Sequence, residues 1–312
     1  MGNISEQSKR FMYLYNRVVD VCKAVIDRLK AEFNDNGFKP HDFELEIKVN
    51  KKETNSDTDS ENDEEAGDDS KKEKTIPAYE LPLIDGKISV KGKIDRVDVY
   101  DNEGIRYIRV VDYKTGNKEF KLSELFSGYN LQMVLYLIAL MKNGGEYYNS
   151  DKMLPAAVLY IPSKIGISDY LSKRHPEDAE IKNNKIKAGK LNGMVLKKTA
   201  VYDAMRVKDN PSYFPVKYDS KSNLVGNNYT TKQFDNLSKM IDDKIIEMGN
   251  MLHCGELAAK PLADDKGPLA CKYCEYKNAC GYEDGDEIAE LYSAKHSDVL
   301  IDKLGGEDDG MD

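Results

Sequence analysis

The sequence contains two stretches that decide the fold, Gly92-Lys93-Ile94-Asp95-Arg96-Val97-Asp98 and Val111-Asp112-Tyr113-Lys114-Thr115-Gly116. Between them stands Asp101-Asn102-Glu103-Gly104, a run of turn-forming residues. Residues 87–100 and 105–114 are rich in β-branched and aromatic residues, which is typical of strands. The pattern therefore predicts a β-hairpin.

Three charged residues of this hairpin are expected to converge. Side chains of a strand alternate between its two faces, so Asp112 and Lys114 project from one face. If the turn has four residues, Asp95 stands opposite Val110 and one diagonal step from Asp112. Asp95, Asp112 and Lys114 then converge, and the two aspartates lie close enough to hold one ion.

Two carboxylates and a lysine on otherwise apolar strands are costly unless they are paired or bound to a metal. Carboxylate oxygens are the hard ligands that Mg²⁺ or Mn²⁺ prefers. Such an ion polarises a phosphate and lowers the pKa of a bound water, and a lysine orients that water or stabilises developing negative charge. This chemistry suits phosphodiester hydrolysis. The alternative is a structural ion pair between aspartate and lysine with no catalytic role.

A helix predicted at 122–142 carries Gln132 and Tyr136, which are four residues apart and share a helix face. They are candidates to bind a substrate phosphate or base, or to hold Lys114 in place. On the hairpin, Gly92 lets another group approach the backbone closely. Alone, Gln132 and Tyr136 are ordinary helix residues.

The rest of the chain predicts a mixed α/β fold. Helical periodicity covers 5–34, where Cys22 lies on the apolar stripe with Phe11, Leu14 and Val18 and is expected to be a packed core residue. Thr230 and Gln233 form a capping pattern at the start of a helix that runs to about 252. Further predicted segments are a strand at 43–49, an acidic disordered insertion at 51–76, a buried strand at 154–161 and an irregular lysine-rich segment at 164–198.

Charge is distributed unevenly along the chain. Residues 53–69 and residues 283–312 each carry a net charge of −9, so the rest carries +9 although the whole chain has −9. A basic body suits a polyanionic partner such as DNA. No apolar run is long enough for a membrane helix. An odd number of cysteines, five, indicates a reducing compartment, and we expect a cytoplasmic protein.

Three of these cysteines cluster as Cys271-x2-Cys274-x5-Cys280. Thiolates at this spacing are typical of zinc or iron–sulfur sites, but three ligands are one short of either. Cys254 and His253 are the nearest candidates for a fourth ligand. The alternative is three unligated thiols.

Together, the two hairpin motifs and Gln132-Met133-Val134-Leu135-Tyr136 resemble the RecB-like branch of the PD-(D/E)XK nucleases. The resemblance implies a restriction-endonuclease-like core, a mixed central sheet flanked by helices. It implies Asp95 and Asp112 as metal ligands, with the Tyr113 carbonyl as a third, and Lys114, Gln132 and Tyr136 as further active-site residues. Glu46 is a weaker candidate ligand and is more typical of a solvated strand residue.

With the cysteine cluster added, the chain resembles the C-terminal nuclease domain of AddB-type subunits. The resemblance implies a DNA exonuclease in double-strand-break repair and recombination, beside an AddA-like helicase subunit. It also implies a [4Fe–4S] cluster on Cys271, Cys274 and Cys280, whose fourth cysteine lies upstream and is absent here. An upstream histidine typical of this branch is absent too, which puts activity of this chain alone in question. We expect an excised C-terminal fragment, with a nuclease domain at 1–282, its cysteine segment at 254–282 and an acidic tail at 283–312.

Two rival interpretations remain. One is a non-catalytic DNA-binding or subunit-docking module, stabilised by a cysteine-bound metal, in which the two aspartates and the lysine form a structural ion-pair network. The other, a zinc-dependent regulator, requires a complete four-ligand site. No P-loop signature is present, so ATP hydrolysis by this chain is not expected.

Overall fold

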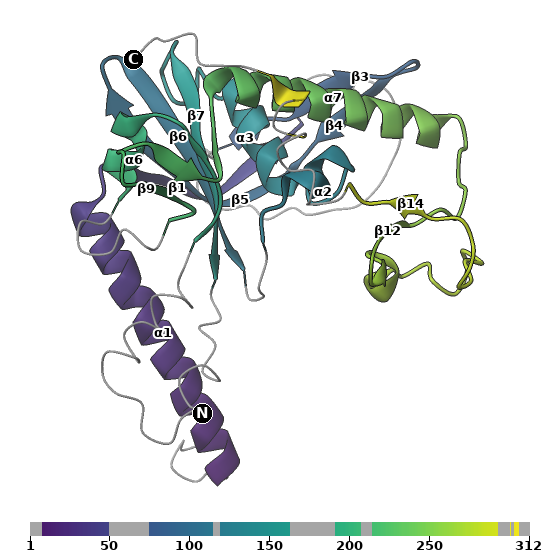
Figure 1. Cartoon of the computed structure of the whole chain (residues 1–312), viewed down its shortest axis with the longest axis horizontal. Coiled ribbons are helices and arrows are strands. Elements are labelled where there is room, and N and C mark those ends of the chain that lie inside the picture. The colour runs from purple at the N-terminus through teal and green to yellow at the C-terminus, as the bar shows by residue number, and fades with distance from the viewer. Residues whose placement is uncertain are drawn as a thin grey trace, which may run out of the picture.

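A computed structural model describes residues 8–49, 75–114, 119–162, 191–206, 214–292, 300 and 303–305. Its centre is a seven-stranded sheet with the strand order β11-β8-β7-β6-β5-β1-β2. The pairs β6–β7, β1–β2 and β8–β11 are parallel, and the other neighbours are antiparallel. Helices flank this sheet (Figure 1), so the predicted mixed α/β architecture is confirmed.

The central sheet and its helices have the following bounds: α1 Lys9–Asp35, β1 Lys39–Lys48, β2 Thr75–Pro77, β5 Gly92–Asn102, β6 Ile105–Lys114, α2 Leu122–Phe126, α3 Gln132–Asn143, β7 Met153–Pro162, β8 Asn192–Leu196, α6 Thr199–Met205, β11 Asn228–Tyr229 and α7 Thr231–His253. Smaller elements form three further sheets and one short helix: β3 Tyr79–Pro82, β4 Lys87–Val90, β9 Val216–Tyr218, β10 Leu224–Gly226, β12 Leu262–Asp264, β13 Gly267–Pro268, η4 Cys271–Tyr273 and β14 Ala289–Glu290.

The β5–β6 hairpin forms as predicted, but its turn has two residues instead of four. Glu103 and Gly104 both have positive φ, 51° and 75°, as a tight type I′ turn requires. Asn102 pairs with Ile105, and the register continues to Arg96 opposite Val111. The expected pairing of Asp95 with Val110 is therefore wrong by two residues, because Val110 pairs with Val97. Extended by one residue, the observed register sets Asp95 opposite Asp112.

The helix predicted at 122–142 is two helices, α2 and α3. Gly128 and Asn130 between them have φ of 76° and 55°, and this left-handed backbone ends the first helix. The capping box predicted for Thr230 and Gln233 is confirmed at the start of α7, where each side chain binds the other residue's backbone N–H.

Helix α1 corrects the expectation for Cys22. The helix extends away from the sheet (Figure 1), and Cys22 is exposed. Phe11, Leu14 and Val18 of the same stripe are exposed as well. Among the helix side chains that the structure describes, Glu32 near the end of the helix is buried.

Other boundaries also differ from the sequence-based expectations. Residues 75 and 76, assigned to the insertion, belong to β2, and residues 50–74 lie outside the described part. Strand β8 falls within 164–198, which was expected to be irregular, whereas 163–190 lie outside the described part. In the segment expected to be an acidic tail, Leu300 and Leu304 are buried. In the described part of the chain, no helix combines the length and apolar character needed to cross a membrane.

A buried carboxylate ties β1 to the turn that follows α3. Asp42 is 2 % exposed and accepts hydrogen bonds from the hydroxyls of Tyr147 (2.7 Å) and Tyr148 (3.2 Å). His41 Nδ1 lies 2.7 Å from the same carboxylate. Burial by itself raises the pKa of Asp42, but the hydrogen bonds from His41 and Tyr147 outweigh it, so the pKa lies below its ordinary value.

We expect Asp42→Asn to lower the free energy of unfolding by about 2–3 kcal/mol at pH 7, because buried hydroxyls lose a charged acceptor. A depressed pKa in the folded state stabilises the fold above the unfolded-state pKa, and this contribution is lost as pH falls through the folded-state value. The difference in the free energy of unfolding between the variant and the unmodified chain should therefore persist from pH 7 to about pH 4 and shrink below it. Urea unfolding at several pH values measures this, with the exposed Glu80→Gln as a control of much smaller effect. An equal deficit at pH 3 and pH 7 would contradict the role of the Asp42 charge.

Candidate active site

The end of the β5–β6 hairpin brings the predicted site residues together. The Asp95 carboxylate accepts a hydrogen bond from the backbone N–H of Tyr113, with 3.0 Å between Oδ2 and N. Tyr113 is the residue between Asp112 and Lys114. Asp95 therefore lies beside the segment that carries the other two charged groups.

Asp112 and Lys114 form an ion pair. The Lys114 Nζ lies 2.8 Å from Oδ2 and 3.0 Å from Oδ1 of Asp112. Only the contact with Oδ1 has hydrogen-bond geometry, which leaves the buried Oδ2 without a hydrogen bond despite the short distance. The Asp112 carboxylate is buried, whereas Lys114 and Asp95 are half-buried.

The donor set fits a divalent cation. One ammonium neutralises one of the two neighbouring carboxylates, and a buried negative charge without a counter-ion is unfavourable. Asp112 Oδ2 has lone pairs available, and Asp95 has a second oxygen besides the one that Tyr113 binds. Mg²⁺ is commonly held by one or two protein carboxylates together with phosphate oxygens and waters, so two aspartates suffice.

Two residues not predicted from the sequence lie near the site: Tyr160, which borders Asp112, and Glu124, which lies near Tyr160. Tyr160 of β7 is paired with Asp112 across the sheet. Burial raises the pKa of Tyr160 above its ordinary value, and the nearby charges of Asp112 and Glu124 raise it further. Glu124 of α2 is buried and lies within contact distance of Lys121 and Asn130. Both residues would be missed from sequence because a tyrosine in a buried strand and a glutamate in a short helix are common.

Gly92 has a clear reason to be glycine. A Cβ at this position would stand 2.2 Å from the Tyr136 hydroxyl, so the tyrosine of α3 lies directly on the start of β5. Gln132 donates to that hydroxyl at 3.2 Å, and this contact confirms that the two residues share a helix face. The expectation that Gly92 allows a close approach is confirmed, and Tyr136 is the group that approaches.

Glu46, the weaker candidate ligand, pairs with Lys48 on its own strand at 2.5 Å. It stands opposite Lys93 in the β1–β5 register. The Lys48 hydrogen bond lowers the pKa of Glu46 despite some desolvation. Glu46 is thus a partly exposed member of a surface ion pair, and its role as a ligand stays a prediction.

The cysteine segment lies beyond the end of α7, away from the sheet (Figure 1). Cys274 and Cys280 are exposed and Cys271 is partly exposed. Within the described ranges, no three cysteine, histidine or acidic side chains gather closely enough to hold a metal. As arranged, these thiols do not fit an iron–sulfur cluster or a zinc ion. Thr115 and Gly116 of the second hairpin motif lie outside the described residues.

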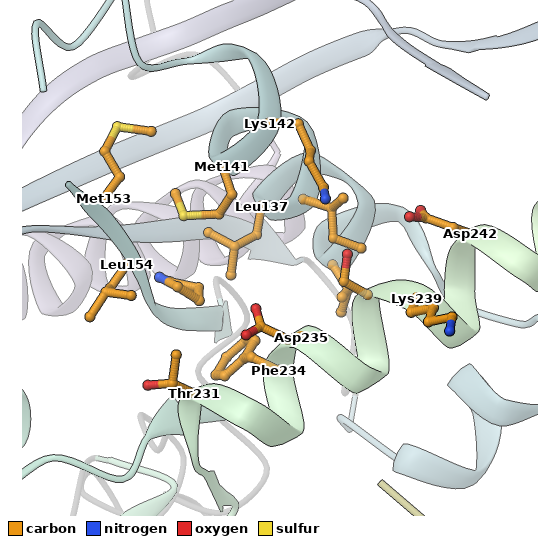
Figure 2. A pocket seen from close by; sticks show the side chains of 14 residues that line it. Leu137, Met141, Lys142, Met153, Leu154, Thr231, Phe234, Asp235, Lys239 and Asp242 are labelled. Atoms are coloured by element: carbon orange, nitrogen blue, oxygen red, sulfur yellow. The ribbon is translucent and has the colours of Figure 1, made fainter. Parts of the chain in front are cut away.

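A cavity of about 530 Å³ lies between α3, the start of β7 and α7 (Figure 2). Its walls include Leu137, Met141 and Phe234, with Asp235 and Asp242 at the α7 side. None of the predicted catalytic or metal-binding residues lines it. Because β6 and β7 are parallel, the start of β7 and the site at the end of β6 lie at opposite ends of the sheet.

The sequence model of the PD-(D/E)XK nuclease superfamily matches residues 4–281. The chain is also 28 % identical over 310 residues to an ATP-dependent helicase/deoxyribonuclease subunit of Clostridium acetobutylicum, covering 97 % of this chain and 24 % of that protein. The protein of the same name from Clostridium novyi is 29 % identical over 315 residues, covering 98 % of this chain and 25 % of that protein. The chain thus spans about a quarter of the length of these relatives.

The contact between Gly92 and Tyr136 gives a test of the site's architecture. Gly92→Ala should cost about 1–3 kcal/mol of stability, because the tyrosine ring must move. The cost should fall in a Tyr136→Ala background, where the obstructing ring is gone. Chemical unfolding of the four proteins measures this coupling. Gly145→Ala is the control, since its added Cβ would meet only an ordinary contact at 3.5 Å. Additive effects of the two changes would show that Tyr136 does not lie on Gly92.

Proposed function

The chain belongs to the PD-(D/E)XK nuclease superfamily, and we propose that its hairpin site hydrolyses phosphodiester bonds of DNA. The observation that carries this proposal is the contact of Asp95 with the Tyr113 N–H, next to the Asp112–Lys114 pair. Two carboxylates and one ammonium are thereby held close together in space at the open end of one hairpin. Asp95, Asp112 and the Tyr113 carbonyl would hold one Mg²⁺ or Mn²⁺.

When bound, the cation polarises the scissile phosphate and makes a water more acidic. The chain's own residues then have separable tasks. Asp95 and Asp112 supply the negative charge that retains the cation. Lys114 would supply an ammonium that orients the attacking water or stabilises charge on the phosphate oxygens.

Gln132 and Tyr136 would act on the substrate side. Gln132 is exposed and its amide is held by the Tyr136 hydroxyl, so a defined donor faces outward near the start of β5. A neutral amide at such a position suits a hydrogen bond to a phosphate oxygen or a base edge. Tyr136 is buried and serves as the support for Gln132.

For the longer protein, we propose an exonuclease role in double-strand-break repair and recombination together with an AddA-like helicase subunit. The name of the relatives, which describes an ATP-dependent helicase/deoxyribonuclease, supports this role. The five cysteines are free, which supports a cytoplasmic location. A [4Fe–4S] cluster stays a prediction for the longer protein, and no step of the proposed reaction uses the cysteines.

A second candidate function is a non-catalytic DNA-binding or subunit-docking module. The Asp112–Lys114 ion pair favours it, because the pair by itself satisfies two of the three buried or half-buried charges. The two candidates differ in whether the site turns over DNA in the presence of a cation.

We expect the chain to degrade end-labelled linear DNA with Mg²⁺ or Mn²⁺ but not with EDTA. Asp112→Asn should abolish cleavage, because the site loses a charged ligand. Lys114→Met should slow cleavage about 10²–10³-fold, the usual effect of removing a group that stabilises transition-state charge. Single-turnover rates on single- and double-stranded substrates measure both effects.

Asp101→Asn is the matched control, because Asp101 lies on the same hairpin and pairs with Arg106 near the turn. Its rate should stay close to that of the unmodified chain. Cleavage by Asp112→Asn at the unmodified rate would refute the proposed site. Binding of DNA without cleavage, by a folded chain in either metal, would support the non-catalytic module if the full-length subunit with its partner also failed to cleave at this site.

A further inference from the structure

A group of buried charges lies behind the candidate site, on the side of the hairpin that carries the Tyr113 side chain. Arg96 of β5 and Arg109 of β6 are fully buried, with 0 % exposure each. Asp98 is likewise 0 % exposed, and Glu32 at the end of α1 is 4 % exposed. Neighbouring residues on a strand point to opposite faces, so Arg96 and Tyr113 project away from the face of Asp95 and Asp112.

These charges are paired with one another across three elements. Glu32 Oε1 accepts from Arg96 Nη2 at 3.1 Å and from Arg109 Nη2 at 2.8 Å. Asp98 Oδ2 accepts from Arg109 Nε at 2.8 Å. Two carboxylates therefore face two guanidinium groups, and one of those carboxylates comes from α1.

Arg96 connects this group to the candidate site. Its Nη1 donates to the Tyr113 hydroxyl at 2.7 Å, and its guanidinium carbon lies 5.7 Å from the centre of the Tyr113 ring. The backbone N–H of the same tyrosine donates to Asp95. Tyr113 thus binds Arg96 through its side chain and Asp95 through its backbone N–H.

We propose that Glu32 and Arg96 are positioning residues that fix Tyr113 and, through its N–H, the carboxylate of Asp95. This inference rests on the proposed function and names which buried residues orient the site. An Arg side chain loses much conformational freedom on burial, and a buried guanidinium is costly unless it is paired with carboxylates, as Arg96 is with Glu32 and Asp98. Arg96 donates to both Glu32 and the Tyr113 hydroxyl. Glu32 therefore restrains the orientation of the guanidinium that holds Tyr113.

The electrostatics of the group agree with this role. Burial by itself lowers the pKa of Arg96, but Asp98 and Glu32 raise it above its ordinary value, so the guanidinium stays charged. Burial raises the pKa of Tyr113, although Arg96 opposes this, so the phenol stays neutral and can accept from Arg96. The link from Glu32 to Asp95 therefore runs through a charged Arg96 and a neutral Tyr113.

Tyr113→Phe removes only the hydroxyl that Arg96 holds and leaves the ring and the backbone in place. In the metal-free chain, the amide of residue 113 should exchange with solvent at least about ten times faster, because its hydrogen bond to Asp95 opens more often. The dissociation constant for Mn²⁺, measured by electron paramagnetic resonance, should rise about three- to tenfold, at the lower end of what outer-shell partners contribute. Glu32→Gln should change both quantities in the same direction.

Tyr148→Phe is the control, because it also removes one tyrosine hydroxyl, in this case one that donates to the buried Asp42 carboxylate. The Tyr148 hydroxyl donates to Asp42 of β1 and its backbone carbonyl accepts from Arg106, so Tyr148 lies outside the link from Glu32 through Arg96 to Tyr113. This control should leave the exchange of amide 113 and the Mn²⁺ affinity unchanged. It corrects for any general loss of stability.

The two measurements separate this inference from the proposed function. Faster exchange at residue 113 with weaker Mn²⁺ binding in Tyr113→Phe would support the positioning role. Unchanged exchange in that variant, or an equal change in Tyr148→Phe, would overturn it whether or not the chain cleaves DNA. Faster exchange in a chain that binds no Mn²⁺ would support the link to Asp95 and would refute the metal-dependent function.

Discussion

Two carboxylates brought together by neighbouring strands repel each other, and this constraint determines what surrounds them. The tight turn at Glu103 and Gly104 sets the β5–β6 register and with it the position of Asp95 opposite Asp112. In the structure, Lys114 compensates Asp112 and the Tyr113 N–H stabilises Asp95. A single ammonium leaves one negative charge, and this remaining charge is the basis of the proposed cation site.

Residues that surround the charged groups hold the site in place from both sides. Tyr136 lies on Gly92 at the start of β5 and holds Gln132, whereas Arg96 holds the ring of Tyr113. Glu32 brings the end of α1 into the same group, although most of that helix lies outside the core. A site assembled from one hairpin is thereby fixed by two helices that are far apart in the sequence.

The sequence predicted the hairpin and its charged residues because both depend on local patterns. Strand alternation and turn residues place Asp112 and Lys114 on one face. An error of two residues in the register still leaves Asp95 on that same face. The size of the turn was misjudged because Asp101 and Asn102 are common turn residues. Here they pair within the ladder, and Arg106 binds Asp101 across it.

The remaining features depend on tertiary contacts that local patterns do not contain. Arg96 and Arg109 are charged residues in strands, which normally face solvent, and they are buried through tertiary contacts that include those with Glu32. Asp42 with its two tyrosines was missed for the same reason. Cys22 was wrongly assigned to the core because an apolar stripe indicates a covered helix face, and within the described part the stripe of α1 is exposed at Phe11, Leu14 and Val18.

The central claim is that Asp95 and Asp112 jointly hold a divalent cation. Anomalous diffraction from crystals of the chain soaked in Mn²⁺ tests it most directly. The account predicts one strong anomalous peak in contact with both carboxylates and the Tyr113 carbonyl, with the Lys114 ammonium displaced from Asp112. An intact Asp112–Lys114 pair without a peak between the two aspartates, at Mn²⁺ concentrations that support DNA cleavage, would contradict it.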